Sequence, residues 1–206
     1  MYFGSEKGTT KNNRYWDSEK NTFCTKILPG EYYYTTEKEY IATTLGSCVS
    51  ACIWDEEHQV GGMNHFMLPL TNKGQDDVTW GNLPTDAARY GNYAMEYLIN
   101  EILKHGGEKT KFKVKVFGGG KVLEGKGDIG ERNIGFVLDY VKTEGLTLIS
   151  QDLGDIYPRK ILFDPLTGRA WVKKIKEKNN ETLANRELDY SKTICNKPVS
   201  GDVDLF

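Results

Sequence analysis

Apolar and polar residues alternate with a period of two in several short segments of the chain. This period puts every second side chain on the same face, and it is typical of half-buried strands rich in β-branched and aromatic residues. Such alternation, or a high content of β-branched and aromatic residues where alternation is missing, predicts strands at residues 32–34, 40–44, 49–54, 60–68, 112–117, 146–153, 159–163 and 169–175. Polar turns at 55–58 and 164–168 join two pairs of these strands into predicted hairpins.

Apolar residues recur at helical spacing in two further segments. The first begins at Thr85-Asp86 and ends before Gly106-Gly107, and the second begins after Gly127-Asp128 and ends at Gly145. A repeat of three to four residues buries one stripe of a helix, and glycine is common just beyond a helix end. Residues 69–84 form a long polar loop, which we interpret either as a lid or binding rim or as an ordinary surface excursion.

The order of these elements predicts a single α+β domain. Strands joined by hairpins dominate the first half, and the helices come later, whereas a doubly wound parallel sheet needs regular alternation of strand and helix. The domain is predicted to span residues 27–175, with a polar N-terminal extension at 1–26 and a polar C-terminal tail at 176–206. We interpret the tail as mobile, with docking of a partner as the alternative.

Composition argues against several classes of partner. The chain has 206 residues and a formal net charge of −2, from 27 basic and 29 acidic residues, which gives no electrostatic attraction to nucleic acid or to an anionic membrane. The sequence contains no apolar run of spanning length and no hydrophobic signal core at its start. We therefore expect a cytoplasmic protein without membrane insertion, in which the four scattered cysteines are free thiols.

Cys48 and His65 are the candidate catalytic residues. Cys48 follows Gly46-Ser47, where a sharp turn can direct consecutive backbone N–H groups toward an oxyanion. His65 lies in an otherwise apolar strand across the predicted hairpin. A thiol nucleophile reacts as the thiolate and needs a neighbouring base. Taken singly, each residue fits ordinary core packing better, but as a pair they fit cysteine-dependent acyl transfer at least as well.

A third group should orient the imidazole, and neither arm of the hairpin contains Asp or Glu. Thr43 or Thr44 could serve through a hydroxyl or a carbonyl. A zinc site made of Cys48, Cys52 and His65 is the competing interpretation, but it offers only three ligands on a spacing unlike the usual Cys-x2-Cys pair. Cys52 is better interpreted as a core residue.

Glycine-rich backbone is predicted to border the pocket. Residues 118–120 match a phosphate-binding loop only superficially, because the outer glycine spacing and the Ser or Thr after the lysine are missing. We interpret them as a close backbone approach or a pocket rim. The predicted substrate-binding residues are Gly46, Ser47, Asn64, Gly118 and Gly119. The residues alone do not choose among a peptidase, an amidase and a transglutaminase, which share a Cys-His dyad.

Five short blocks of sequence stand in a specific order along the chain. They are Leu45–Val49, Gly61–Pro69, Arg89–Met95, Phe117–Gly120 and Asp128–Asn133. In this order the chain resembles the chemoreceptor glutamine deamidases, the CheD family of bacterial chemotaxis. The resemblance covers about residues 27–175, and five ordered blocks are far more specific than any one of them.

The resemblance implies a fold and a reaction. Members of the family are cytoplasmic enzymes with a three-layer α/β/β sandwich, and they hydrolyse glutamine side chains on the cytoplasmic helices of receptors to glutamate and ammonia. It implies that Cys48 is the nucleophile and that His65 is the base and later the acid. It also implies an orienting threonine just before the Leu-Gly-Ser-Cys block, and we place Thr43 before Thr44 in that role. Some relatives also hydrolyse receptor methyl esters, and some bind a CheC-type phosphatase.

Two other functions stay open at the level of the sequence. A non-catalytic adaptor could keep the fold and bind a CheC-type phosphatase or a receptor, although it would not need the Cys-His pair. A thiol peptidase or a toxin-like deamidase could act on a different protein. The acyl-transfer chemistry requires neither a metal nor an organic cofactor, and we expect none.

Overall fold

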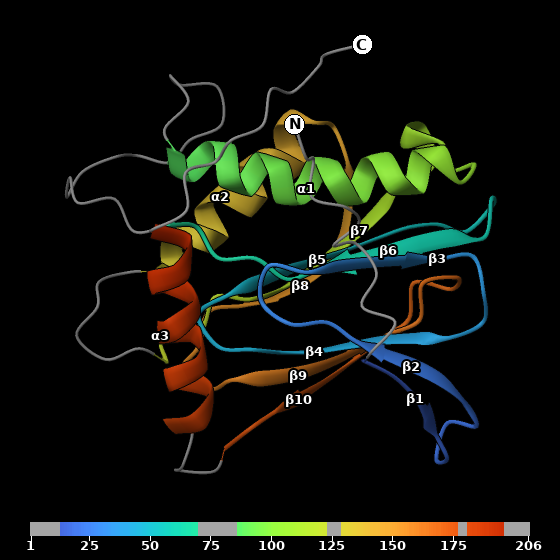
Figure 1. Cartoon of the computed structure of the whole chain (residues 1–206). Coiled ribbons are helices and arrows are strands. Elements are labelled where there is room, and N and C mark those ends of the chain that lie inside the picture. The colour runs from blue at the N-terminus through green and yellow to red at the C-terminus, as the bar shows by residue number, and fades with distance from the viewer. Residues whose placement is uncertain (1–12, 70–85, 123–128, 177–180, 196–206) are drawn as a thin grey trace, which may run out of the picture.

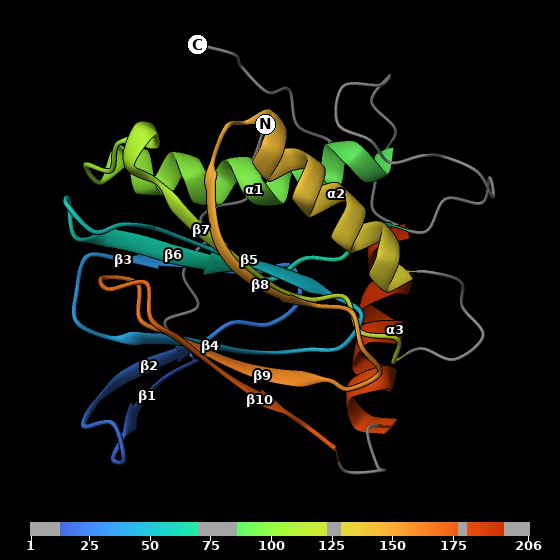
Figure 2. The ribbon, with the colours of Figure 1, turned by 180° about the vertical axis from the view of Figure 1, so that it is seen from behind.

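The protein is built in three layers. In the computed structural model, two five-stranded sheets lie face to face, and helices α1 (Asp86–Lys104) and α2 (Ile129–Thr143) cover the outer face of one of them (Figure 1). A third helix, α3 (Glu181–Cys195), stands across one end of both sheets in the two opposite views (Figures 1 and 2). This is the predicted α+β sandwich. The structure describes residues 13–69, 86–122, 129–176 and 181–195.

The helix-covered sheet has the strand order β3-β6-β5-β7-β8. Its pairs are antiparallel except for β7 and β8, which run parallel. The strands are β3 (Tyr32–Thr35), β5 (Val49–Asp55), β6 (Val60–Asn64), β7 (Lys113–Gly118) and β8 (Thr147–Leu153). The first predicted hairpin is confirmed as β5 and β6, with Asp55 opposite Val60. β6 ends at Asn64, earlier than predicted, and among the described residues up to 69 Phe66 pairs again, with Val49.

The second sheet has the strand order β1-β2-β4-β9-β10. The strands are β1 (Arg14–Asp17), β2 (Thr22–Lys26), β4 (Tyr40–Leu45), β9 (Arg159–Phe163) and β10 (Ala170–Lys174). β9 and β10 confirm the second predicted hairpin. Its turn closes through a hydrogen bond from Gly168 N to Asp164 O, and the φ of 68° at Gly168 is one that glycine adopts without strain.

β5 lies at the centre of the fold because both of its faces are buried. Ala51 and Ile53 face the core beneath the helices, whereas Cys52 and Trp54 face the core between the sheets. The ring of Trp54 packs edge-on against Phe163 of the second sheet. A strand with two buried faces has no polar side, which explains why residues 49–54 are almost continuously apolar.

Both predicted helices are confirmed, and each turns one apolar stripe to the sheet. Met95 and Leu98 of α1 pack in the same core as Phe136 and Tyr140 of α2. Gly145, just beyond α2, has a φ of 65°, as expected for a glycine that ends a helix. Among the residues in the described ranges, no helix combines the length and apolar character needed to cross a bilayer.

The structure differs from the sequence prediction before residue 27. β1 and β2 form a hairpin at the edge of the second sheet, and β2 pairs in parallel with β4. Trp16 and Phe23 are exposed and pack on each other, while Cys24 and Thr25 are buried next to one another in β2. Alternation is therefore weak in this segment, and the pattern gives no strand signal. The domain limit at 27 stays a prediction, but the sheet begins before it.

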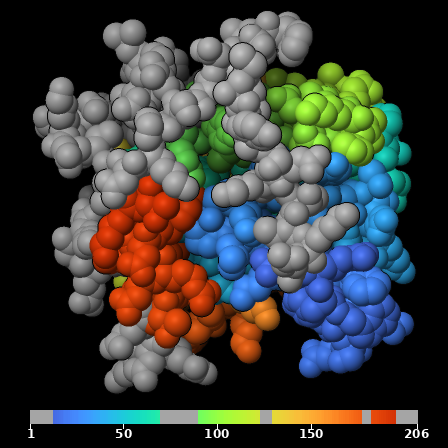
Figure 3. All heavy atoms as spheres, in the orientation of Figure 1, coloured from blue at the N-terminus to red at the C-terminus, as the bar shows by residue number. Residues whose placement is uncertain are grey.

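The structure also differs from the predicted mobile tail, because residues 181–195 form α3. Figure 3 shows this helix in red on the surface of the molecule. Only one narrow side of it is buried, which leaves the segment polar overall and hides its helical pattern. The predicted polar loop at 69–84 lies outside the described residues except for Pro69.

Candidate active site

The turn at residues 46–48 carries the chain from one sheet to the other. It follows β4 of the second sheet and precedes β5 of the helix-covered sheet. The carbonyl oxygens of residues 46, 47 and 48 accept hydrogen bonds from Gly120 N at 2.7 Å, Asn133 Nδ2 at 2.8 Å and Gly119 N at 2.8 Å, respectively. All three carbonyl groups thus have hydrogen-bond partners on one side of the turn. The N–H groups of the same residues are left for another partner.

The three N–H groups of this turn converge on one carboxylate, that of Glu187 in α3. Gly46 N lies 2.8 Å from Oε1, Ser47 N 2.8 Å from Oε2, and Cys48 N 3.4 Å from Oε1. The Ser47 hydroxyl donates to Oε2 at 2.7 Å. Glu187 is fully buried, and charge-assisted hydrogen bonds of this kind offset the cost of burying a carboxylate. The turn is therefore an anion-binding site next to the Cys48 thiol.

Gly118 permits the close backbone approach behind the turn. Its φ is 112°, and an added Cβ would lie 2.1 Å from the carbonyl oxygen of Cys48. We expect Gly118→Ala to lower the free energy of unfolding by about 3 kcal/mol or more, because both the strain and the clash involve backbone. Gly135→Ala is the control, since this exposed α2 residue has open space around it and the change should stabilise by up to about 1 kcal/mol. Urea unfolding measures both, and equal stabilities would contradict the expectation.

His65 lies just beyond β6, at the same open end of the hairpin as Cys48. The Val49–Phe66 bridge sets this register, with N–O distances of 2.9 Å in both directions. The backbone of His65 is also tied to the preceding loop, through bonds from His65 N to Glu31 O and from Gly30 N to His65 O. The predicted proximity of the thiol and the imidazole thus follows from strand register.

Thr43 of β4 orients the imidazole ring. Its hydroxyl donates to the carbonyl of Ile27 at 2.9 Å and lies 2.7 Å from Nδ1 of His65. Since the hydroxyl hydrogen is used, Nδ1–H is the donor of the second bond, and Nε2 is left as the unprotonated nitrogen. Nε2 is buried and has no hydrogen-bond partner among the described residues. An imidazole in this tautomer can accept a proton at Nε2.

Sulfur, imidazole nitrogen and carboxylate oxygen meet at this site. One such atom each from Cys48, His65 and Glu187 lie within 4.8 Å of one another. Burial raises the pKa of the Cys48 thiol well above its ordinary value, and the neighbouring Glu187 carboxylate raises it further. Burial lowers the pKa of His65 to about 3. At neutral pH this state therefore holds a neutral thiol beside a neutral imidazole.

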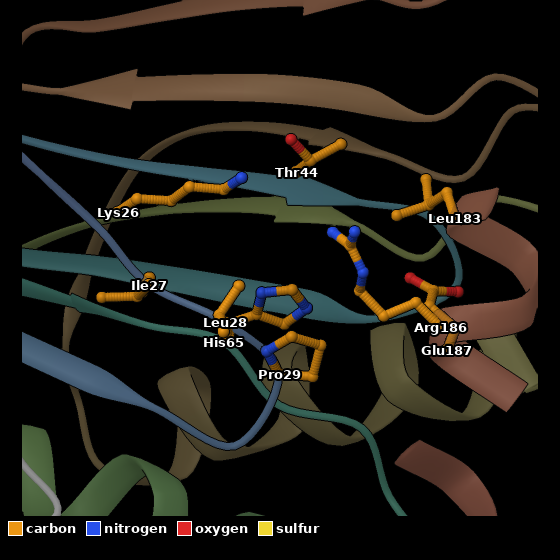
Figure 4. A pocket seen from close by; sticks show the side chains of 9 residues that line it. All are labelled: Lys26, Ile27, Leu28, Pro29, Thr44, His65, Leu183, Arg186 and Glu187. Atoms are coloured by element: carbon orange, nitrogen blue, oxygen red, sulfur yellow. The ribbon is translucent and has the colours of Figure 1, made fainter. Parts of the chain in front are cut away.

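A narrow crevice leads to His65 between the sheets and α3. Figure 4 shows His65 and Glu187 facing this crevice from different elements, with α3 as one wall. Its lining consists of Lys26, Ile27, Leu28, Pro29, Thr44, His65, Leu183, Arg186 and Glu187. Cys48 and His65 are both buried, and residues of α3 form one wall of the crevice.

Cys48, His65 and Glu187 also form a set of side chains that could hold a metal ion. The set differs from the zinc site considered from the sequence, because Glu187 takes the place of Cys52. Both carboxylate oxygens of Glu187, however, already accept hydrogen bonds from the turn. This use of the oxygens favours an anion site over a cation site.

Comparison with known proteins decides the family. The family profile described as "CheD chemotactic sensory transduction" matches residues 67–174. A Halorhodospira halophila protein named "Probable chemoreceptor glutamine deamidase CheD" is 55% identical over 195 residues, which cover 94% of this chain and 89% of that protein. This chain belongs to the CheD family.

Two further CheD relatives have the same name. The protein from Hahella chejuensis is 46% identical over 94% of this chain and 90% of its own length. The protein from Herminiimonas arsenicoxydans is 50% identical over 94% of this chain and 94% of its own length. The family that the five sequence blocks resemble is confirmed.

The structure brings together most of the residues that the sequence singles out for this CheD site. Thr43, rather than Thr44, contacts His65, while Thr44 lines the crevice. Gly46 and Ser47 supply N–H donors beside Cys48. Their assignment as substrate-binding residues stays a prediction that this geometry supports.

The other three predicted substrate-binding residues, Asn64, Gly118 and Gly119, make contacts within the fold. Gly118 and Gly119 lie behind the turn, where Gly119 N supports the Cys48 carbonyl and neither glycine lines the crevice. Asn64 turns its amide toward α1, donating to Ala94 O at 3.0 Å and accepting from Ala51 N at 2.8 Å. A substrate-binding role for these three residues stays a prediction, and the contacts that they make in this structure are with the scaffold.

Sequence reasoning missed two residues of the site, Asn133 and Glu187. Asn133 bridges the turn to the chain after β6, because its Oδ1 accepts from Leu68 N at 2.9 Å while its Nδ2 donates to Ser47 O. It lies in one of the family blocks but carries no chemical signal of its own. Glu187 lies on a helical stripe with Leu183 and Ile194, a spacing that could have revealed α3.

Replacement of Thr43 tests its positioning role. Thr43→Val keeps the shape but removes the hydroxyl, and we expect kcat to decrease between about 10- and 100-fold because the ring loses its fixed tautomer and orientation. Thr43→Ser restores the hydroxyl and should recover most of the rate. A purely structural role would lower the stability of both variants and leave kcat of the folded protein unchanged.

Proposed function

We propose that this protein is a cysteine-dependent protein-glutamine deamidase of bacterial chemotaxis. It converts glutamine side chains on the cytoplasmic helices of chemotaxis receptors to glutamate, releases ammonia and so modulates signalling. The names of the CheD relatives, chemoreceptor glutamine deamidases, support receptor glutamines as the substrate. The observation that carries the chemistry is the anion site at residues 46–48, which directs its N–H groups to a point beside the Cys48 sulfur and the His65 ring.

The first half of the proposed reaction forms a thioester. His65 accepts the Cys48 proton, and the thiolate adds to the carbon of the glutamine carboxamide. The carbonyl oxygen becomes an oxyanion, which the N–H groups of residues 46–48 stabilise at the place where Glu187 Oε1 and Oε2 now lie. His65 then gives its proton to the nitrogen, the C–N bond breaks, and ammonia leaves.

The second half releases glutamate. His65 accepts a proton from water, the resulting hydroxide adds to the thioester carbon, and the same N–H groups hold the new oxyanion. The C–S bond breaks and the proton returns to sulfur. One water is consumed for each ammonia released, and Cys48 and His65 return to their starting states.

The remaining expectations of the family belong to the same proposal. A receptor methyl ester would react at Cys48 by the same steps, with methanol as the leaving group instead of ammonia. A CheC-type phosphatase is the proposed partner besides the receptors, and the cytoplasm is the proposed compartment.

Mass spectrometry of a receptor cytoplasmic fragment tests the proposal. We expect wild-type protein to increase the mass of the fragment by about one dalton per converted glutamine, with an equal amount of ammonia in solution. Backbone cleavage of the fragment would identify a thiol peptidase instead. Binding of the fragment without either change would leave the adaptor function.

A further inference from the structure

α3 presents to the anion site the chemical group that the proposed reaction produces. The Glu187 carboxylate is the side chain of a glutamate, and it accepts four hydrogen bonds from the turn, including that of the Ser47 hydroxyl. One of its oxygens lies within 4.8 Å of the Cys48 sulfur and of an imidazole nitrogen of His65. The glutamate formed from a receptor glutamine would occupy the same donors beside the same sulfur.

We propose that α3 is an internal product mimic, which occupies the place of the substrate helix and must leave before a receptor segment can enter. This inference rests on the proposed function. It names a regulatory contact of the site, and it implies that the substrate glutamine is presented from the middle of a helix, as Glu187 is. Any partner that holds α3 away from the turn activates the enzyme.

The contacts of α3 suit a segment that docks reversibly. Of its side chains from 182 to 194, only Glu187, Ser191 and Ile194 are buried. Tyr190 adds a hydrogen bond between its hydroxyl and that of Tyr90 in α1, and it packs over Gly30. With so few anchors, the fully buried carboxylate of Glu187 is the main specific contact of the helix.

The docked helix also makes the Cys48 thiol a weaker nucleophile. The groups that face the Cys48 sulfur are the His65 imidazole and the Glu187 carboxylate, with the Tyr90 and Tyr190 hydroxyls nearby. The carboxylate opposes ionisation of the thiol and, together with burial, raises the pKa of Cys48. Release of α3 removes the negative charge and admits water, and both changes favour the thiolate.

Glu187→Gln converts the mimic into a substrate within the full chain. The Cys48 thiolate would add to the side-chain carbon of the new glutamine, the C–N bond would break with loss of ammonia protonated by His65, and water would cleave the thioester. Mass spectrometry of the Lys-C peptide 179–192 should show conversion at position 187 to Glu, a gain of about one dalton. Cys48→Ala/Glu187→Gln should keep the glutamine, which also controls for spontaneous deamidation of the asparagines in that peptide.

The outcomes separate this inference from the proposed function. Conversion that depends on Cys48 supports both. A glutamine that persists at 187, while wild-type protein deamidates the receptor fragment, overturns the product mimic and leaves the function intact. A persistent glutamine together with an unreactive receptor fragment overturns both.

A second pair of variants measures inhibition directly. Glu187→Ala should increase the rate of receptor deamidation at low substrate concentration by about tenfold or more, because a docked helix reduces the fraction of enzyme that can bind substrate. Cys48 should also react faster with iodoacetamide in this variant. Asp189→Asn changes an exposed carboxylate of the same helix and should match wild type in both measurements. A Glu187→Ala protein no faster than wild type in either measurement would overturn the proposal.

Discussion

Cys48→Ala should lower the rate of receptor deamidation by roughly 10,000-fold or more. Without the sulfur no thioester forms. The N–H groups of residues 46–48 remain, but no protein nucleophile is left to add to the amide that they would bind. The fold should survive, because the change removes one atom from a buried site and costs about 1 kcal/mol of stability. Initial rates from the one-dalton mass gain of the receptor fragment measure the effect.

Cys52→Ala is the matched control for this experiment. Cys52 is another fully buried thiol and packs in the same core between the sheets as Cys48. It does not belong to the group of Cys48, His65 and Glu187. The control should keep the wild-type rate within about threefold, since it alters packing but not chemistry. A Cys48→Ala protein as active as Cys52→Ala would refute the nucleophile.

His65→Ala should lower kcat by roughly 1,000-fold, the usual scale for removal of a general base that also acts as the acid. The reason lies in the arrangement of the ring, where Thr43 fixes Nδ1–H and Nε2 stays without a partner among the described residues. The variant should also slow the alkylation of Cys48, because the thiol loses its proton acceptor. Added imidazole should restore part of the rate by entering the space left by the ring.

His105→Ala is the control for His65. His105 lies beyond the end of α1, where its Nδ1 contacts Glu101 O and its Nε2 contacts the Tyr34 hydroxyl, and it takes no part in the crevice. Its removal should leave kcat unchanged. If His65→Ala kept more than about a tenth of the wild-type rate, the ring would have a packing role rather than a catalytic one.

Strand patterns predicted the part of the site that depends on local register. β5 and β6 are separated by one polar turn, so residue composition and turn chemistry were enough to place Cys48 and His65 at one end of a hairpin. The two helices had clear apolar stripes because each packs on the sheet along one side. Thr43 was a choice between two neighbours, and strand alternation directs only one of them to the ring.

Contacts over long sequence distances could not be predicted in the same way. Glu187 lies 141 residues after Gly46 along the chain, and its segment is polar because the helix buries only one narrow side. Asn133 reaches the turn from α2 across 86 residues, and an asparagine near a helix start fits many roles. Both residues act through hydrogen bonds to backbone, and a hydrophobic period can indicate their helices but not these polar contacts.

Labelling with an electrophilic glutamine analogue tests the central claim most directly. A receptor-derived helical peptide would carry a chloromethyl ketone in place of the carboxamide, so that the thiolate displaces chloride while the N–H groups of the turn hold the ketone oxygen. We predict one adduct per chain, located by peptide mapping on Cys48 and absent from Cys48→Ala. Labelling of Cys24, Cys52 or Cys195 instead, or no adduct with a protein that deamidates the receptor, would contradict the account.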